Sequence, residues 1–256
     1  MSKRENETVG AIHPADPGSG NLPSAVETED ELKNALALAE KKLHIVGTVT
    51  RHDVLNQLTA IFGYNELLGM MVEDPKQRSF IEKEKLAVEK IRRQFYFAKD
   101  YQNIGAESAR WQTLKNVIHR AGEDVDLKAV RINDMTGGAS VYADPLFEKV
   151  LSNLFENTLC YGGTASEIRI SLHRKDTGAV LVVEDNGTGI PHDEKTRVFE
   201  HGYGNGTGWG LFLAREILAV TGMTIAETGE PGKGTRFEIL IPEGMYRPEG
   251  GEPQAP

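Results

Sequence analysis

Hydrophobic residues in the first part of the chain recur at steps of three and four, the spacing of one face of an α-helix. The spacing predicts a helix from Thr28, a suitable N-cap that three acidic residues follow, and the helix would run some 40 residues, about 60 Å. Its apolar seam is of coiled-coil type. The seam residues are Leu32, Leu36, Ala39, Leu43, Val46, Val54, Leu58, Ile61, Leu67 and Leu68.

A second helical pattern follows a short interruption between Gly69 and Val72. Asp74 and Pro75 suit the N-cap and first position of a new helix, which heptad-like apolar steps carry to about Asn103. The short connection makes the two helices antiparallel. Because two helices enclose little core, we expect two chains to pair their hairpins in a dimeric four-helix bundle. The alternative is a hairpin of one chain packed on the domain that follows.

The remaining pattern is of mixed class. It predicts helices over 114–121, 145–160 and 210–220, and strands over 131–135, 140–142, 167–174, 179–184, 224–228 and 235–241. This succession predicts an α+β fold in which helices cover one face of a sheet, an α/β sandwich. The expected organisation is a disordered leader 1–27, a helical hairpin 28–105, a linker 106–110, a mixed domain 111–243 and a flexible tail 244–256.

Composition narrows the function classes. The net charge of -9 over 256 residues argues against a nucleic-acid partner. No apolar run approaches the roughly 18–20 residues of a membrane span, and the start lacks a secretory signal pattern. The one cysteine, Cys160, excludes an internal disulfide within one chain. Together these features predict a cytoplasmic protein with no membrane segment in this chain.

The first helix carries a short set of reactive side chains: His52, Asp53 and Asn56. His52 and Asn56 are four apart and share a face, while Asp53 projects about 100° round the helix. His52 lies about 200° from Val54 of the apolar seam, so we expect it to face solvent. An imidazole beside a carboxylate and a carboxamide suits nucleophilic chemistry. Taken alone, the same residues could equally form an ordinary solvated face.

Three glycine-containing segments of the mixed domain could approach a ligand. They are 184–191 after a buried strand, 202–211 leading into a helix, and 232–235 between two strands. Glycine lets backbone N–H groups approach a phosphate, and the helix that opens at Gly210 offers its positive end to an anion. Asp185 at a strand end can accept a hydrogen bond from an exocyclic amine. Each segment alone could be an ordinary turn, and the sequence has no Walker-type P-loop.

A helix between these segments carries amide and phenol groups along one stripe. Asn153, Asn157 and Tyr161 step by four, with Glu156 beside them. Oxygen ligands of this kind suit magnesium, which keeps several waters and uses substrate phosphates for the rest. Alone, the asparagines could equally be a loop cap and a solvated side chain.

Taken in order, these segments resemble a bacterial or archaeal two-component sensor histidine kinase over about residues 28–242. The resemblance implies a dimerisation and histidine-phosphotransfer hairpin followed by a GHKL-type catalytic and ATP-binding domain. It implies a homodimer that uses ATP and Mg²⁺ to phosphorylate His52. The phosphoryl group would then pass to an aspartate on the receiver domain of a response regulator, which the chain could also dephosphorylate.

The resemblance also assigns roles to single residues. His52 would accept the phosphoryl group, Asp53 would assist proton removal, and Asn56 would position water for dephosphorylation of the partner. Asn157 would bind the ATP-bound magnesium, with Asn153 as its companion. The remaining nucleotide-binding residues would be Tyr161 against the nucleotide, Asp185 on adenine, and Gly187, Gly189, Gly206, Gly208, Gly210, Gly234 and Thr235 in the glycine-containing boxes.

Four positions depart from the family pattern. Asp53 stands where the family usually has Glu, Gln57 where proline is common, Cys160 where Lys or Arg is frequent, and Trp209 where Leu is usual. Cys160 removes a possible phosphate contact, and the lid over 201–206 is short. Three rival functions remain: a non-catalytic phosphotransfer or scaffold protein of this fold, a GHKL ATPase or serine kinase of the anti-sigma type, and a purely structural coiled-coil dimer.

Overall fold

The computed structural model describes residues 25–125, 127, 130–204 and 208–249. Contacts divide the chain into two units, Met1–Val49 and Thr50–Pro256. Helix α1 (Ala25–Met71) confirms the first predicted helix and begins three residues before the predicted cap. The prediction of a disordered leader is therefore wrong for residues 25–27, and its residues 1–24 lie outside the described part. Within the first unit, Leu32 and Leu36 are exposed.

In the second unit, the remainder of α1 and helix α2 (Pro75–Asn103) form the predicted hairpin. The backbone N–H of Lys76 donates to the Asp74 carboxylate at 3.1 Å, and Pro75 occupies the first turn, as the sequence indicated. Two cross-helix contacts define the antiparallel register. Arg51 Nη1 donates to Gln102 Oε1 at 2.9 Å, and Lys85 pairs with Glu66 at 2.6 Å. The side chains buried in the hairpin are Leu58, Asn65, Ile81 and Val88.

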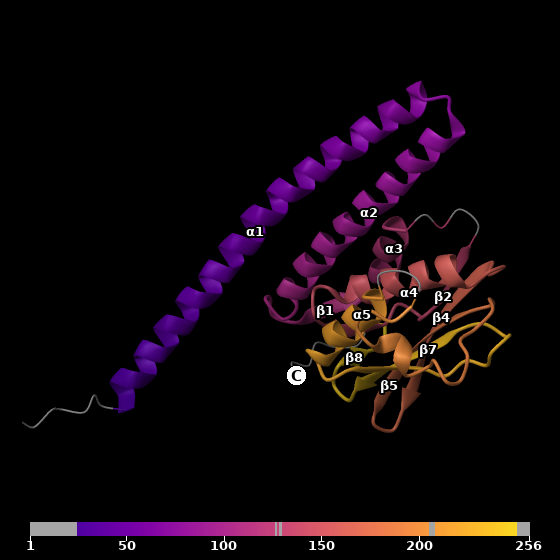
Figure 1. The fold of residues 1–256 in the computed structure, drawn as a ribbon. Coiled ribbons are helices and arrows are strands. Elements are labelled where there is room, and N and C mark those ends of the chain that lie inside the picture. Colours follow the sequence, from indigo (N-terminus) through magenta and orange to yellow (C-terminus); the bar gives the residue numbers. More distant parts are fainter. Residues whose placement is uncertain (1–24, 126, 128–129, 205–207, 250–256) are drawn as a thin grey trace, which may run out of the picture. The chain divides into compact units, whose positions relative to one another are not determined.

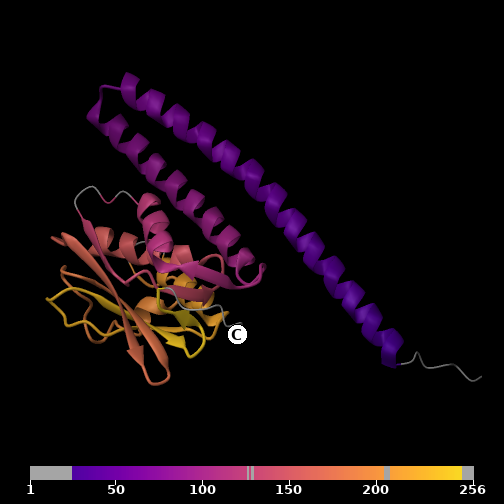
Figure 2. The same ribbon diagram turned by 180° about the vertical axis from the view of Figure 1, so that it is seen from behind.

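A five-stranded sheet forms the base of the mixed domain (Figure 1). Its strands run in the order β2 (Arg131–Met135), β4 (Glu167–Lys175), β5 (Gly178–Asp185), β7 (Arg236–Pro242) and β6 (Thr224–Glu227). β2 and β4 are parallel and the other neighbours antiparallel. Helices α3 (Leu114–Glu123), α4 (Phe147–Tyr161) and α5 (Gly210–Ala219) cover one face of this sheet (Figures 1 and 2). The α+β architecture predicted from the sequence is confirmed.

A smaller antiparallel sheet has the order β1 (Arg110–Thr113), β3 (Ser140–Ala143) and β8 (Tyr246–Arg247). β8 corrects the expectation of a flexible tail, because Tyr246 and Arg247 pair with β3. Strand β1 begins at Arg110, so the linker predicted over 106–110 ends at residue 109. Both strands are too short to show an alternating pattern, and each pairs with β3 along one edge.

The core lies between the helices and the sheet. Strand β5 is buried almost throughout, and its alternate residues Ala179, Leu181, Val183 and Asp185 share one face. Ala179, Leu181 and Val183 belong to the main hydrophobic cluster, so Asp185 ends the strand on the helix-covered side. Phe97 of α2 also packs against this cluster. No helix among the described residues is both long and apolar enough to cross a membrane.

Candidate functional site

Asp185 is buried, with 8% of its surface exposed, and four donors surround its carboxylate. The backbone N–H groups of Gly187 and Thr235 donate to Oδ1 at 2.8 and 3.1 Å. The hydroxyls of Thr158 and Thr235 donate to Oδ2, the first at 3.0 Å. α4, the end of β5 and the start of β7 therefore meet at this one side chain.

The turn between β6 and β7 closes directly over Asp185. A Cβ atom placed on Gly234 would lie 1.9 Å from the Asp185 carbonyl oxygen, and Gly234 has a φ of +108°. Gly189 also approaches this turn, because a Cβ there would lie 2.8 Å from the Gly234 carbonyl oxygen. The backbone N–H of Gly232 donates to Thr188 O at 2.7 Å. Gly189 and Gly234, both predicted from the sequence, therefore permit close backbone packing that a side chain at either position would prevent.

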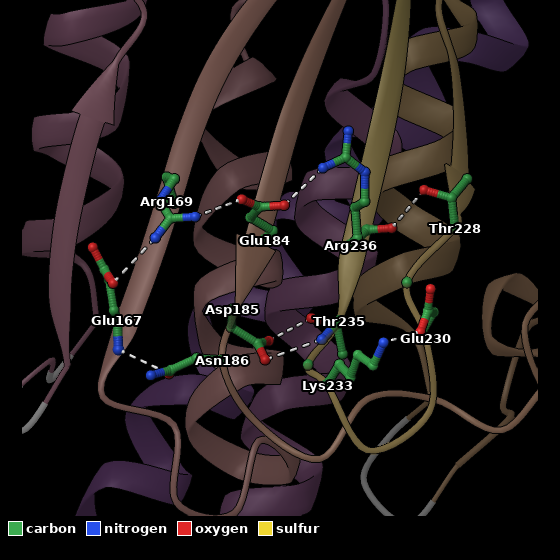
Figure 3. Close-up of a pocket in the computed structure, with 12 residues that line it drawn as sticks. Glu167, Arg169, Glu184, Asp185, Asn186, Thr228, Glu230, Lys233, Thr235 and Arg236 are labelled. Atoms are coloured by element: carbon green, nitrogen blue, oxygen red, sulfur yellow. Dashed lines mark hydrogen bonds and ion pairs between the residues drawn. The ribbon is translucent and has the colours of Figure 1, made fainter.

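On the other face of the sheet, charged side chains form a ladder across β4, β5 and β7 (Figure 3). Arg169 and Arg236 donate to the two oxygens of Glu184 at 3.0 and 2.7 Å. Glu184 is the neighbour of Asp185, so the ladder fixes the strand end from the face opposite the aspartate. It borders a shallow hollow of about 360 Å³, which Lys233 also lines.

A larger cleft of about 850 Å³ opens on the helix side of the domain. The predicted site residues that line it are Asn153, Asn157, Tyr161, Gly189, Gly208, Gly210 and Thr235. Asp185 and Gly234 line the smaller hollow instead, and Gly187 is absent from the described lining of both. His52, Asp53 and Asn56 are absent from its described lining. Gly206 lies outside the described residues.

The two asparagines of α4 differ in their surroundings. Asn153 Nδ2 donates to the Gly210 carbonyl at 2.9 Å and ties α4 to the first turn of α5. None of the described residues donates a hydrogen bond to the Asn153 oxygen. Asn157 Nδ2 is buried and has no hydrogen-bond partner among the described residues. A buried amide group without a partner is costly, which favours a ligand at this point of the cleft.

Aromatic side chains pack together around His201, at the start of the predicted lid, and Trp209, shortly after its end. The His201 ring stacks on Trp209 at 5.7 Å, and Phe97 of α2 lies 4.7 Å from Trp209. Phe212 of α5 meets His201 edge to face at 5.2 Å. Trp209, where the family usually has Leu, therefore contacts both Phe97 of α2 and His201, and it stands directly before the first residue of α5.

His52 is exposed, as predicted, with 73% of its side chain accessible. Its Nδ1 lies 3.3 Å from Asp53 Oδ1 and 3.3 Å from Asn56 Nδ2, while Nε2 lies 3.5 Å from Asn56 Nδ2. Because one nitrogen cannot both donate and accept, the tautomer selects the partner. When Nδ1 carries the proton it donates to Asp53, and the lone pair of Nε2 faces only the Asn56 amide among the described residues, at the long distance of 3.5 Å.

A charged group lies at the N-terminal end of α4. Lys149 Nζ donates to Asp124 Oδ2 at 2.7 Å. Burial opposes the charge of Lys149, but the hydrogen bond to Asp124 and the charges of Asp124, Asp100 and Glu148 raise its pKa above the ordinary value. Burial raises the pKa of Asp100 on α2, while the charges of Lys149, Lys99 and Arg51 oppose that rise.

Sequence reasoning missed several contributors to this site. Thr158 follows Asn157 directly and contacts Asp185, but a threonine in a helix gives no sign of such a contact. Lys149 lies four residues before Asn153, so extending the i, i+4 stripe by one turn would have found it. Lys195 and Glu227 form a buried ion pair at 2.7 Å behind the loop, and only the tertiary fold brings them together.

Comparisons with known proteins agree with this geometry. Residues 143–245 match the family described as histidine kinase-, DNA gyrase B- and HSP90-like ATPase. Sensor protein KdpD of Escherichia coli is 28% identical over 231 residues, covering 84% of this chain and 25% of that protein. Alginate biosynthesis sensor protein KinB of Pseudomonas aeruginosa is 37% identical over 100 residues, which cover 37% of this chain and 17% of that protein. Sensor protein SrrB of Staphylococcus aureus is 23% identical over 249 residues, covering 88% and 42%.

Solved structures share the fold. Full-length ShkA in complex with AMPPNP has a TM-score of 0.58 at 20% identity, over 77% of this chain and 45% of that one. The Acinetobacter baumannii histidine kinase AdeS has a TM-score of 0.51 at 20% identity, over 74% and 97%. The chain spans less than half the length of the sensor proteins named above. Residues 143–245 therefore form a domain of this ATPase family, and over most of its length the chain is similar to the kinase core of two-component sensor proteins.

Proposed function

We propose that this chain is an ATP-dependent protein-histidine kinase that phosphorylates its own His52. The phosphoryl group then passes to an aspartate on the receiver domain of a response regulator. The observation that carries this proposal is the exposed His52 ring with the Asp53 carboxylate 3.3 Å from Nδ1, in a chain that also holds an ATPase domain.

The geometry suits attack by Nε2. With the Nδ1 proton held by Asp53, the Nε2 lone pair attacks the γ-phosphorus of ATP. The Nε2–P bond forms while the bond from the γ-phosphorus to the bridging oxygen breaks, and its electron pair leaves with ADP. Asp53 then stabilises or accepts the Nδ1 proton as the ring becomes positive. Since phosphoryl transfer depends mainly on positioning and charge neutralisation, a short Asp53 that reaches Nδ1 serves this purpose.

The nucleotide would occupy the 850 Å³ cleft. Asp185 is screened from the cleft by Thr235, whose hydroxyl donates to Oδ2, so an exocyclic adenine amine would reach Oδ2 only after this hydroxyl turns aside. Tyr161, half exposed at the rim, would lie against the base. Gly208 and Gly210 stand at the N-terminus of α5, where backbone N–H groups favour phosphate.

The amide groups of α4 fit a magnesium ion carried by the nucleotide. Among the described residues no hydrogen bond occupies the side-chain oxygen of Asn153 or Asn157, so both oxygens are available to a cation, while the unpartnered Nδ2 of Asn157 would donate to a phosphate oxygen. Magnesium accepts one or two such oxygens and takes its other ligands from phosphates and water. When bound, it would neutralise charge on the phosphates. Asn157 would hold it, with Asn153 orienting the start of α5.

The hairpin supports a homodimer. Apolar side chains remain exposed on both helices of the second unit, including Ile61 and Leu68 on α1 and Leu86 and Ile91 on α2. A second hairpin that covered them would complete a four-helix bundle. The receiver domain would approach His52 on the exposed face of the same bundle.

Radiolabelling with ATP and magnesium tests the function. We expect wild type to acquire an acid-labile label and His52→Ala to acquire none. A persistent acid-labile label on His52→Ala would refute the assignment, and an acid-stable label would indicate a serine kinase. Mixing His52→Ala with Asn157→Ala subunits tests the homodimer and the direction of transfer, because only transfer between chains restores the label.

Two further measurements separate the roles and the rival function. Asp53→Ala should slow labelling, whereas Asn56→Ala should mainly slow dephosphorylation of the regulator. Equal loss of both activities in both variants would contradict this division. A non-catalytic scaffold of the same fold would bind no nucleotide, so nucleotide titration of the wild type distinguishes it.

A further inference from the structure

The cleft contains a lysine to which no role has been assigned above. Lys149 lies four residues before Asn153 and eight before Asn157, so the three side chains share one stripe of α4. All three line the cleft. At 1.5 Å per residue, Lys149 is about 6 Å along the helix from Asn153 and about 12 Å from Asn157.

The order of groups along α4 gives the cleft a direction. Near its C-terminal end, Thr158 donates to Asp185, and Tyr161 lines the cleft where the base is predicted to bind. Asn153, nearer the start, contacts Gly210 at the N-terminus of α5. A nucleotide with its base near Tyr161 and its phosphates near Gly210 would therefore direct its terminal phosphate toward Lys149.

The charge of the cleft makes this cation important. Among the described lining residues contributed by the ATPase domain, Lys149 is the one cation, and Asp124, Glu156 and Glu194 are acidic. The two arginines that α2 adds, Arg92 and Arg93, are both paired with Glu89, at 2.8 and 3.2 Å. A polyphosphate in this cleft meets more carboxylates than cations. Lys149 is paired too, with Asp124 at 2.7 Å, so a change of partner from Asp124 to a phosphate has a strong effect.

Lys149 also lies at the end of the cleft nearest the phospho-accepting region. Asp100 of α2 is close enough to Lys149 and to Arg51 for both charges to act on its carboxyl group. Arg51 is the chain neighbour of His52 and bonds to Gln102 of α2. Lys149, Asp100 and Arg51 thus form a series of charged side chains from the phosphate end of the cleft to the chain neighbour of His52.

We infer that Lys149 binds the terminal phosphate of the nucleotide, and that the Lys149 ammonium group bonds to Asp124 when that phosphate is absent. This inference rests on the proposed function, since it concerns the same cleft. Lys149 thereby makes the cleft prefer a triphosphate over a diphosphate. It provides a phosphate-binding cation that position 160, occupied by Cys160, does not supply.

Nucleotide titration of the full chain by calorimetry tests this inference, with AMPPNP, ADP and AMP in the presence of magnesium. We expect Lys149→Met to weaken AMPPNP binding about tenfold relative to ADP, the size of a lost charged hydrogen bond, and to leave AMP binding unchanged. Lys149→Arg should keep most of the preference. Lys175→Met, at the exposed end of β4, is the matched control and should behave as wild type.

Asp124→Asn provides a test that does not remove the lysine. It frees Lys149 and removes one anion, so AMPPNP should bind severalfold more tightly relative to ADP. An unchanged ratio of AMPPNP to ADP affinity in both Lys149→Met and Asp124→Asn would overturn the inference, as would an equal loss for AMP. If wild type binds no nucleotide, the proposed function fails as well. If wild type binds nucleotide but neither variant changes the ratio of AMPPNP to ADP affinity, only the role assigned to Lys149 is refuted.

Discussion

The buried ion pair between Lys195 and Glu227 allows a sharp test of how the loop after Asp185 is held. Nζ and Oε2 are 2.7 Å apart, and the two side chains are 15% and 0% exposed. Glu227 Oε1 also accepts the backbone N–H groups of Gly229 and Arg236 at 3.0 and 3.2 Å. Lys195 additionally donates to the Gly229 carbonyl. The pair therefore joins the segment before η1 (Arg197–Phe199) to the β6–β7 turn.

Lys195→Met removes the cation and leaves a carboxylate that is fully shielded from water. Breaking a buried pair from one side costs about 3–5 kcal/mol of unfolding free energy, because the remaining charge is uncompensated. Adding Glu227→Gln neutralises the second group and keeps a carbonyl oxygen for Gly229 and Arg236. The double variant should therefore recover much of the loss and be more stable than Lys195→Met alone.

Urea unfolding of the full chain, followed by tryptophan fluorescence, measures this effect. The chain has two tryptophans, Trp111 and Trp209, and both lie in the part that contains the ATPase domain. Lys233→Met is the matched control. It breaks an ion pair with Glu230 in the same turn whose side chains are 74% and 68% exposed, so stability should stay close to wild type. Equal unfolding free energies for Lys195→Met and Lys233→Met would refute the reasoning.

Three further variants test two other features, the turn over Asp185 and the carboxyl group of Asp100. Gly234→Ala should cost about 3 kcal/mol or more and weaken nucleotide binding, because its Cβ would overlap the Asp185 carbonyl. Gly232→Ala, with φ +83° but no atom within 4 Å, should cost only about 1–2 kcal/mol in the same denaturation assay; equal losses would contradict the overlap argument. Burial raises the pKa of Asp100, so the folded state favours its protonated form and loses stability as pH rises through that raised value. Asp100→Asn should therefore raise the melting temperature at neutral pH, with the gain disappearing in acid below the ordinary aspartate pKa; a gain independent of pH would contradict this.

Secondary structure was largely predictable because its signals are local. The periods of 3.6 and 2 located the helices and most strands, and Asp74 with Pro75 located the start of α2. β1 and β8 were missed because strands of four and two residues show no period. Their formation depends on β3, which is distant in the sequence from Tyr246.

The sequence by itself determined which residue types could bind a nucleotide and accept a phosphoryl group. The stripe from Asn153 to Tyr161 and the His52 neighbourhood follow from helix geometry alone. Only the tertiary structure decided that Asp185 bonds to Thr235, that Lys149 bonds to Asp124, and that Lys195 pairs with Glu227. These contacts join segments separated by 25 to 50 residues, and their geometry depends on which faces of helix and sheet pack together. Local periodicity carries no information on that packing.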